Sequence, residues 1–147
     1  MQNIIKQLRQ AKMAHKRWVG HASAMIEGIP IEKDQVPINY TDCKFGHWYY
    51  DHGQNLSSLQ EFKEIEEPHT ELHHIYMEIF NLLFGKKKRT FFDKLIGRTA
   101  KLSDEDRKLA RVKFRTLDQA SKEIIAKLDK LEAKVKKMGE EKVAALN

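Results

Sequence analysis

Apolar residues recur at steps of three and four along most of this chain, which is the spacing of amphipathic helices that pack one face into a core. The pattern predicts a first helix over residues 2–27, a second over 57–84 and a third from Ser103 to about Gly139. Pro68 interrupts the second segment, so we expect a kink there or a separate preceding helix. The pattern therefore predicts an all-α protein built on long helices.

A shorter helix is expected over about residues 43–50, with Thr41 or Asp42 as its N-cap. Cys43 would then lie in its first turn, where the helix dipole favours a thiolate. Three long helices and shorter ones favour an antiparallel four-helix-type bundle with a short extra helix that carries the cysteine. We expect residues 1–147 to form one domain.

Composition supports this interpretation. The chain has 147 residues, of which 41% are hydrophobic and 33% are charged, which is typical of one helical, water-exposed domain rather than a disordered chain. No apolar run approaches the roughly 18 residues that a membrane span needs, and the N-terminus lacks the apolar core of a signal peptide. We therefore expect a cytoplasmic protein. Its only cysteine is Cys43, which excludes an intramolecular disulfide.

The net charge of +6 is unevenly distributed. Residues 1–85 carry 8 Lys/Arg against 11 Asp/Glu, a net charge of −3, and residues 86–147 carry 19 against 10, a net charge of +9. One hypothesis is therefore a basic helical module over 86–142 that binds nucleic acid or an acidic surface. Acidic residues interleave with the lysines throughout 104–142, which favours a solvated helix face, so no nucleic-acid partner is expected. The basic segment 86–102 has no assigned role.

Seven histidines are many for this length, and three of them occupy notable positions. His69 and His73 are four residues apart, so both rings project from one helical face. His15 lies in the middle of the apolar stripe of the first helix. A single histidine on such a stripe is more often a core residue than a ligand. Together with Cys43, however, these side chains supply three nitrogens and one sulfur, a tetrahedral donor set that zinc prefers.

Three short sequence motifs carry a family resemblance. His15 is followed by Lys-Arg-Trp, residues 43–48 read Cys-Lys-Phe-Gly-His-Trp, and residues 68–73 read Pro-His-Thr-Glu-Leu-His. This order resembles the chemoreceptor zinc-binding (CZB) domain family, which has a histidine on its first helix, a Cys-x-(Leu/Phe)-Gly-x-Trp word and a His-x-x-x-His pair. The resemblance covers about residues 5–85 well, and the C-terminal helix, about 103–139, only loosely.

The resemblance implies that His15, Cys43, His69 and His73 bind one Zn²⁺. It also implies a cytoplasmic bacterial regulatory module without catalytic activity, usually fused to chemoreceptor signalling segments or diguanylate cyclase domains. Expected partners are thus chemotaxis or cyclic-di-GMP signalling proteins, with homodimerisation. Members of the family are associated with sensing zinc or oxidants such as hypochlorous acid, and Cys43 would be the redox-sensitive residue. This sequence shows neither output domain, so its output stays open.

Four residues near the predicted ligands are expected to support the site. Trp18, one turn after His15, would form a wall that limits solvent. Phe45 and Trp48 are expected to anchor the short helix in the core. Gly46 would permit close approach of this helix to its neighbours.

Other polar residues leave alternatives open. His47 and His52 are close to the cysteine in sequence and are alternative ligands, whereas His21 and His74 are expected to face water. A carboxylate is a frequent partner of a ligand imidazole, and three are candidates here: Asp42, Glu66 and Glu71.

An enzymatic alternative is a di-iron carboxylate bundle, which needs two Glu-x-x-His words and further carboxylates. The sequence contains two such motifs, Glu66 to His69 and Glu71 to His74, but both fall on one predicted helix, whereas a di-iron bundle takes them from two helices. Four protein ligands would also leave no open position for a substrate water, so we expect a regulatory rather than a catalytic site.

Overall fold

The structure is a computed structural model that describes residues 2–29, 39–84 and 103–144. Within these ranges every regular element is helical, which confirms the predicted all-α class. The elements are α1 (Gln2–Ile26), α2 (Lys44–Tyr50), the 3-10 helix η2 (His52–Leu56), α3 (Gln60–Lys63), α4 (Glu66–Phe84) and α6 (Asp104–Ala144). The basic segment 86–102 lies outside the described residues.

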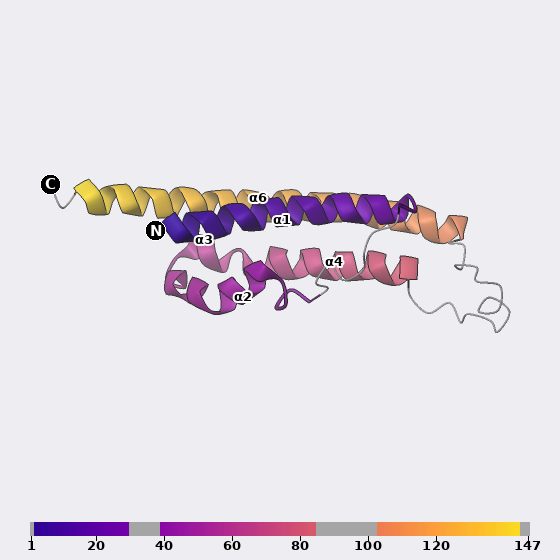
Figure 1. The fold of residues 1–147 in the computed structure, drawn as a ribbon, viewed down its shortest axis with the longest axis horizontal. Helices are drawn as coiled ribbons and strands as arrows, with labels where there is room; N and C mark the ends of the chain where they lie inside the picture. Colours follow the sequence, from indigo (N-terminus) through magenta and orange to yellow (C-terminus); the bar gives the residue numbers. More distant parts are fainter. Residues whose placement is uncertain (1, 30–38, 85–102, 145–147) are drawn as a thin grey trace.

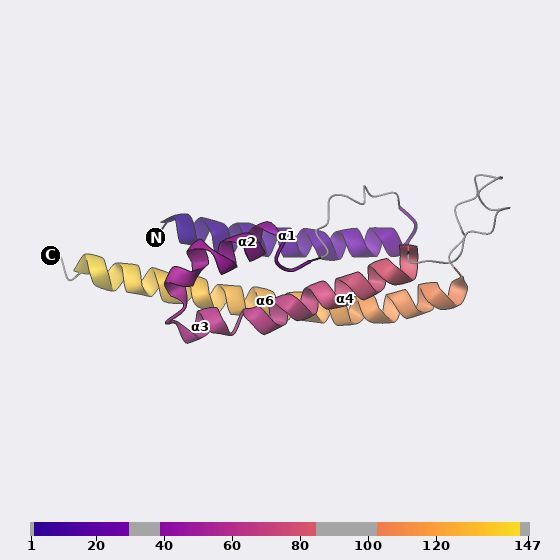
Figure 2. The same ribbon diagram turned by 90° about the horizontal axis from the view of Figure 1, so that it is seen from below.

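Three long helices, α1, α4 and α6, form the frame of the molecule (Figure 1). α1 and α4 run in the same direction, and α6 runs antiparallel to both and packs against both. The short α2 lies against α1, and α3 lies against α6, as seen from below in Figure 2. Among the described residues the frame thus consists of three long helices, and the short α2 packs against α1.

The apolar stripes predicted from the sequence form one core between these helices. Six residues of the α1 stripe are buried: Leu8, Ala11, His15, Trp18, Ala22 and Met25. They face a fully buried seam on α6 that contains Ala110, Leu117, Ile124, Leu128 and Leu131. Each fully buried large aliphatic side chain contributes about 1.5–3 kcal/mol relative to an exposed one, so this seam holds the frame together.

Helix ends follow from identifiable residues. Gly28 adopts a positive φ of 79° and ends α1, as predicted, while the N–H of Ile29 donates to the carbonyl of Ala24 at 2.9 Å. Pro68 lies in the first turn of α4, where its missing N–H is tolerated, and α3 precedes it as a separate helix. Of the two outcomes predicted for Pro68, the structure has the separate helix.

Two sequence predictions about exposure are wrong. The last helix continues past Gly139 to Ala144, and Gly139 is buried while Met138, placed on the predicted seam, is 42% exposed. The reason is that the seam steps by four residues from Val135 to Gly139. His21, predicted to face water, is half-buried, and its Nδ1 lies out of contact with solvent.

An ionic network fixes α1 against α6. Glu132 of α6 is almost fully buried and accepts from Arg9 at 2.9 Å and from Lys12 at 2.7 Å, both on α1. Lys12 also donates to Asp129 at 2.6 Å, and Lys136 approaches Glu132 to 2.8 Å from the next turn of α6. A buried carboxylate with three cationic partners tolerates little sliding of one helix along the other.

None of the described helices combines the length and the apolarity that crossing a membrane requires.

Candidate metal centre

Three histidines from two helices converge in the core. His15 projects from α1, and His69 and His73 project from successive turns of α4. Each side chain is about 1% exposed, and one ring nitrogen of each lies within 4.8 Å of the others. The i, i+4 spacing on α4 and the central position on the α1 stripe, both read from the sequence, are therefore brought together. α1 and α4 run in the same direction, and the middle of α1, where His15 lies, faces the first turns of α4, which carry His69 and His73.

The only cysteine joins this cluster from a third element. Cys43 is 2% exposed, and its Sγ lies 3.4 Å from Nε2 of His69. With metal–sulfur and metal–nitrogen bonds of about 2.3 and 2.05 Å, a tetrahedral zinc site places these atoms about 3.6 Å apart. The observed separation therefore fits two ligands of one tetrahedral ion.

A tight turn before α2 holds the sulfur. Cys43 is itself the N-cap of α2, so the predicted caps Thr41 and Asp42 and the predicted first-turn position of the cysteine are wrong. The N–H of Gly46 donates to Sγ at 3.1 Å, and the S–H donates to the carbonyl of Tyr40 at 3.4 Å. The sulfur thus replaces the usual oxygen of an N-cap side chain.

Gly46 is required by this turn, as its predicted role in close approach suggests. A Cβ added to Gly46 would collide with the carbonyl oxygen of Tyr40 and lie 3.1 Å from Cα of Thr41. Both obstacles are backbone atoms, which cannot rotate away. Any side chain at this position would therefore displace the turn that carries Cys43.

The ring of His15 is oriented by backbone rather than by a carboxylate. Its Nδ1 donates to the carbonyl of Ala11 at 2.7 Å, one turn earlier on α1. This bond leaves Nε2 as the unprotonated nitrogen, and Nε2 is buried with no hydrogen-bond partner among the described residues. A buried lone pair without a donor costs about 1–3 kcal/mol, and a bound cation at this position would remove that cost.

Aromatic rings enclose the cluster. Trp18 contacts His15 and His73 edge-on, with ring centroids 5.3 and 4.7 Å apart. Phe45 contacts His15 and His69 in the same manner, at 5.9 and 5.0 Å. Trp18 and Phe45, both expected to support the site, thus contact the histidines directly. Trp48 is half-buried and packs on Phe45, with ring centroids 5.6 Å apart, so it supports the ring of Phe45.

Burial keeps His15 and His69 neutral. Desolvation lowers the pKa of His15 to about 4, although its bond to Ala11 acts in the opposite direction. Desolvation, with the neighbouring histidines, lowers the pKa of His69 to about 2. Neutral imidazoles are the form that binds metal, so these rings need lose no proton to become ligands at neutral pH.

The thiol behaves differently from the sequence prediction. A helix N-terminus was expected to favour the thiolate, yet the pKa of Cys43 is raised, because desolvation outweighs the N–H groups that face the sulfur. A cation bound among the histidines would supply the positive charge that a buried thiolate needs. The donor set and its burial are thus compatible with a divalent metal.

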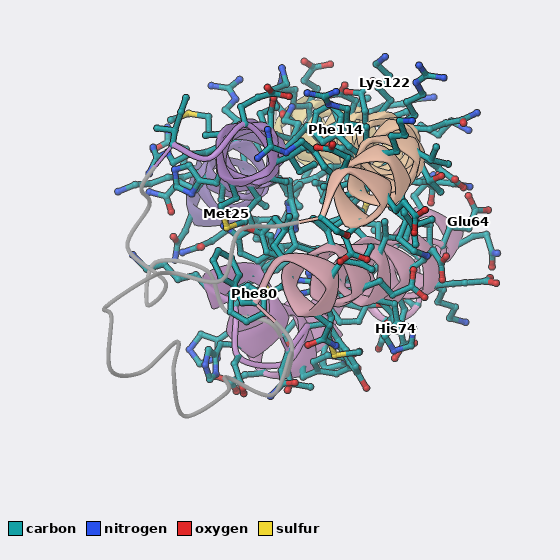
Figure 3. The ribbon with its side chains drawn as sticks, turned by 90° about the vertical axis from the view of Figure 1, so that its right-hand side faces the viewer. Met25, Glu64, His74, Phe80, Phe114 and Lys122 are labelled. Carbon is teal, nitrogen blue, oxygen red and sulfur yellow. The ribbon has the colours of Figure 1, made fainter. Side chains whose placement is uncertain are left out.

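The alternative ligands and orienting groups from the sequence do not reach the cluster. His47 and His52 are exposed, as is His74, which projects from the outer side of α4 in Figure 3. The three candidate carboxylates are also exposed: Asp42, Glu66 and Glu71. Glu66 accepts from the hydroxyl of Tyr50 at 3.0 Å instead. These residues therefore do not supply the carboxylates around the ions that a di-iron site needs.

Comparison with known proteins found one family to which part of the chain is similar. Residues 15–80 match the family model of the chemoreceptor zinc-binding domain, and this segment contains all four predicted ligands. Searches among curated proteins and among solved structures found no match. The match covers somewhat less than half of the chain and ends within α4, so α6 lies outside it. The resemblance seen in the sequence is thereby confirmed over residues 15–80, which are similar to the chemoreceptor zinc-binding domain family.

Proposed function

We propose that this chain is a zinc-dependent regulatory module in which His15, Cys43, His69 and His73 hold one Zn²⁺. The observation that carries the proposal is the convergence of these four buried donors, from three separate elements, in a segment that matches a zinc-binding family. The unpartnered Nε2 of His15 and the 3.4 Å approach of Sγ to His69 support zinc over simple core packing.

A set of four protein ligands gives a closed site. When bound, zinc would supply charge to stabilise the buried thiolate and would tie α1, α2 and α4 together. No position remains for a substrate water, which supports regulation rather than hydrolysis. The chain's own residues hold the donors neutral and dry, through the aromatic walls Trp18 and Phe45 and through the Ala11 carbonyl.

Cys43 is the proposed point of chemical control. Hypochlorous acid would convert its thiolate to the sulfenic acid with release of chloride, and the oxidised sulfur is a poorer metal ligand. Loss of this ligand would free the turn from Tyr40 to Cys43 and allow α2 to move on α1. The 2% exposure of Cys43 favours small oxidants, since a bulky disulfide cannot reach the sulfur unless α2 opens.

The output is proposed from the family alone. Chemotaxis or cyclic-di-GMP signalling proteins are the expected partners, and a homodimer and a cytoplasmic location are expected in the same way. Zinc availability, rather than oxidation, is the alternative stimulus, because metal binding itself would order α2 against α1 and α4.

The experiment that tests the proposal measures zinc release from the zinc-loaded chain with a colorimetric indicator during titration with hypochlorous acid. Wild type should release zinc as the thiol is consumed. Met13→Leu is the control for general oxidation. Met13 is exposed and oxidisable, and its side chain projects from the side of α1 opposite to His15. This variant should release zinc like wild type, whereas Cys43→Ala, loaded at higher zinc, should show no oxidant-dependent release. Equal release from Cys43→Ala and wild type would contradict the redox role.

A further inference from the structure

The outer face of α1 carries only positive charge. Between Gln2 and Ile26 the helix contains no Asp or Glu and five basic residues, although residues 1–85 as a whole have a net charge of −3. These cations are Lys6, Arg9, Lys12, Lys16 and Arg17. No other described helix of comparable length lacks acidic residues, so this face differs in kind from the mixed surfaces of α4 and α6.

The fold satisfies only part of this charge. Lys12 and Arg9 are engaged by Glu132 and Asp129 of α6. Lys6, Lys16 and Arg17 are exposed and form no ion pair within the described parts of the chain. Arg9 also keeps 59% of its side chain exposed despite its bond to Glu132. Four cationic groups therefore remain available to a partner along one side of α1.

An apolar element lies among these cations. Met13 is 61% exposed, the largest exposed fraction among the large hydrophobic side chains of the described residues. With Ile5 it lines a shallow groove along α1, which Lys136 borders from α6. α6 extends beyond the N-terminus of α1, as Figures 1 and 2 both show, and so supplies the second wall at this end.

The spacing of these groups suits a helical partner. Ten or eleven residues separate Lys6 from Lys16 and Arg17, which is about 15–16 Å along the helix axis at 1.5 Å per residue. Carboxylates at i, i+3 or i+4, i+7 and i+11 of a second helix would span the same length on one face. We propose that this face of α1 docks an acidic amphipathic helix of a partner protein, with an apolar residue of that helix against Met13 and Ile5.

Other anionic partners fit the surface less well. The only aromatic residue of α1 with a base-stacking ring is Trp18, which is buried in the core. One exposed methionine offers little apolar area for insertion into a bilayer. The docking face is also opposite to the side of α1 that carries His15, so the proposal does not depend on the metal.

The test uses the full chain and a synthetic helix-forming peptide of about 18 residues, with Glu along one face and Leu beside it. Fluorescence anisotropy gives its Kd for wild type and for K6E/K16E/R17E. The matched control is R115E/K130E/K134E, which changes net charge equally at three exposed α6 cations that form no ion pair among the described residues. The first variant should lose at least about tenfold in affinity, and the control should stay within about twofold.

Two further measurements separate the explanations. Met13→Ser should weaken the peptide by about threefold or more without any change of charge, if the apolar contact is made. Circular dichroism should show that all variants are folded, since every changed residue is exposed. K6Q/K16Q/R17Q changes the charge by less and should therefore lose an intermediate amount of affinity for the peptide. Equal losses in both triple variants would overturn the proposal, because they would reduce it to net charge. Tighter binding of duplex DNA or phosphatidylglycerol vesicles than of the peptide would overturn it in favour of those partners.

Discussion

Gly46→Ala tests the turn that holds the sulfur. The added methyl group would collide with the carbonyl oxygen of Tyr40 and lie 3.0 Å from the carbonyl carbon of that residue. Relief requires the backbone on one side of Cys43 to move, because no flexible side chain takes up the contact. The same movement weakens the 3.1 Å bond from the Gly46 N–H to Sγ.

The expected magnitude follows from these two losses. Overpacking against backbone costs about 1–3 kcal/mol, and loss of an outer group that orients a metal ligand costs about 10–100-fold in metal affinity. For a domain of this size, a loss of 1 kcal/mol lowers Tm by about 3–5 °C. Gly46→Ala should therefore melt roughly 3–15 °C lower and bind zinc at least about tenfold more weakly.

Gly20→Ala is the matched control. Gly20 is exposed within α1, and no atom lies within 4 Å of a Cβ added there. Alanine in an open helix position should stabilise the chain by about 0.5–1 kcal/mol and leave zinc affinity unchanged. Thermal melts by circular dichroism and zinc competition against a chromogenic chelator report both quantities. If Gly46→Ala matched wild type in Tm and zinc affinity, the reasoning about this turn would be refuted.

Three other predictions concern the core and the ionic network. Hydrogen bonds from Lys12 and its neighbours lower the pKa of Glu132 to about 2, so its ionised form stabilises the fold by on the order of 3 kcal/mol at neutral pH. That contribution is complete above pH 4.5 and is lost as pH falls through about 2. The difference in unfolding free energy between wild type and E132Q should therefore shrink over this window. Tyr49→Phe removes a buried hydroxyl that donates to the Phe62 carbonyl at 3.2 Å and should cost about 1 kcal/mol in urea unfolding. The Cys43 thiol of the metal-free chain should react with an aromatic disulfide reagent far more slowly when folded than in urea, and equal rates would contradict its burial.

Helix periodicity predicted the three long helices well, because the core is built from long stripes of apolar residues along them. The apolar spacing located α1, α4 and α6, and Gly28 marked the end of α1 as expected. Periodicity did not fix the end of α6, since Gly139 continues the buried seam by a four-residue step and no competing cap stops the helix. A glycine is a helix stop only where the chain needs a positive φ.

The sequence indicated which donors would lie together, but not the groups that position them. Spacing and the family words selected the four predicted ligands, and the structure brings them together. The groups that position them are mainly backbone: the Ala11 carbonyl for His15, and the Gly46 N–H and Tyr40 carbonyl for Cys43. Backbone groups carry no residue-type signal, so the sequence suggested carboxylates that are in fact exposed. Gly46 was the one sequence signal of this turn.

The desolvation of Cys43 was also beyond the sequence. Its predicted place in the first turn of a short helix pointed to a thiolate, but the opposing effect depends on how many atoms cover the sulfur in the fold. That quantity exists only in the folded chain.

The central claim is that four buried donors hold one zinc ion, and metal content measures it most directly. Purified wild type should contain about one zinc per chain by elemental analysis, consistent with a single closed tetrahedral site. Cys43→Ala and His73→Ala should lose most of it after mild chelation, whereas His74→Ala, one residue further on the exposed side of α4, should retain it. Wild type without zinc, and with a Tm that neither zinc addition nor chelation changes, would contradict the account.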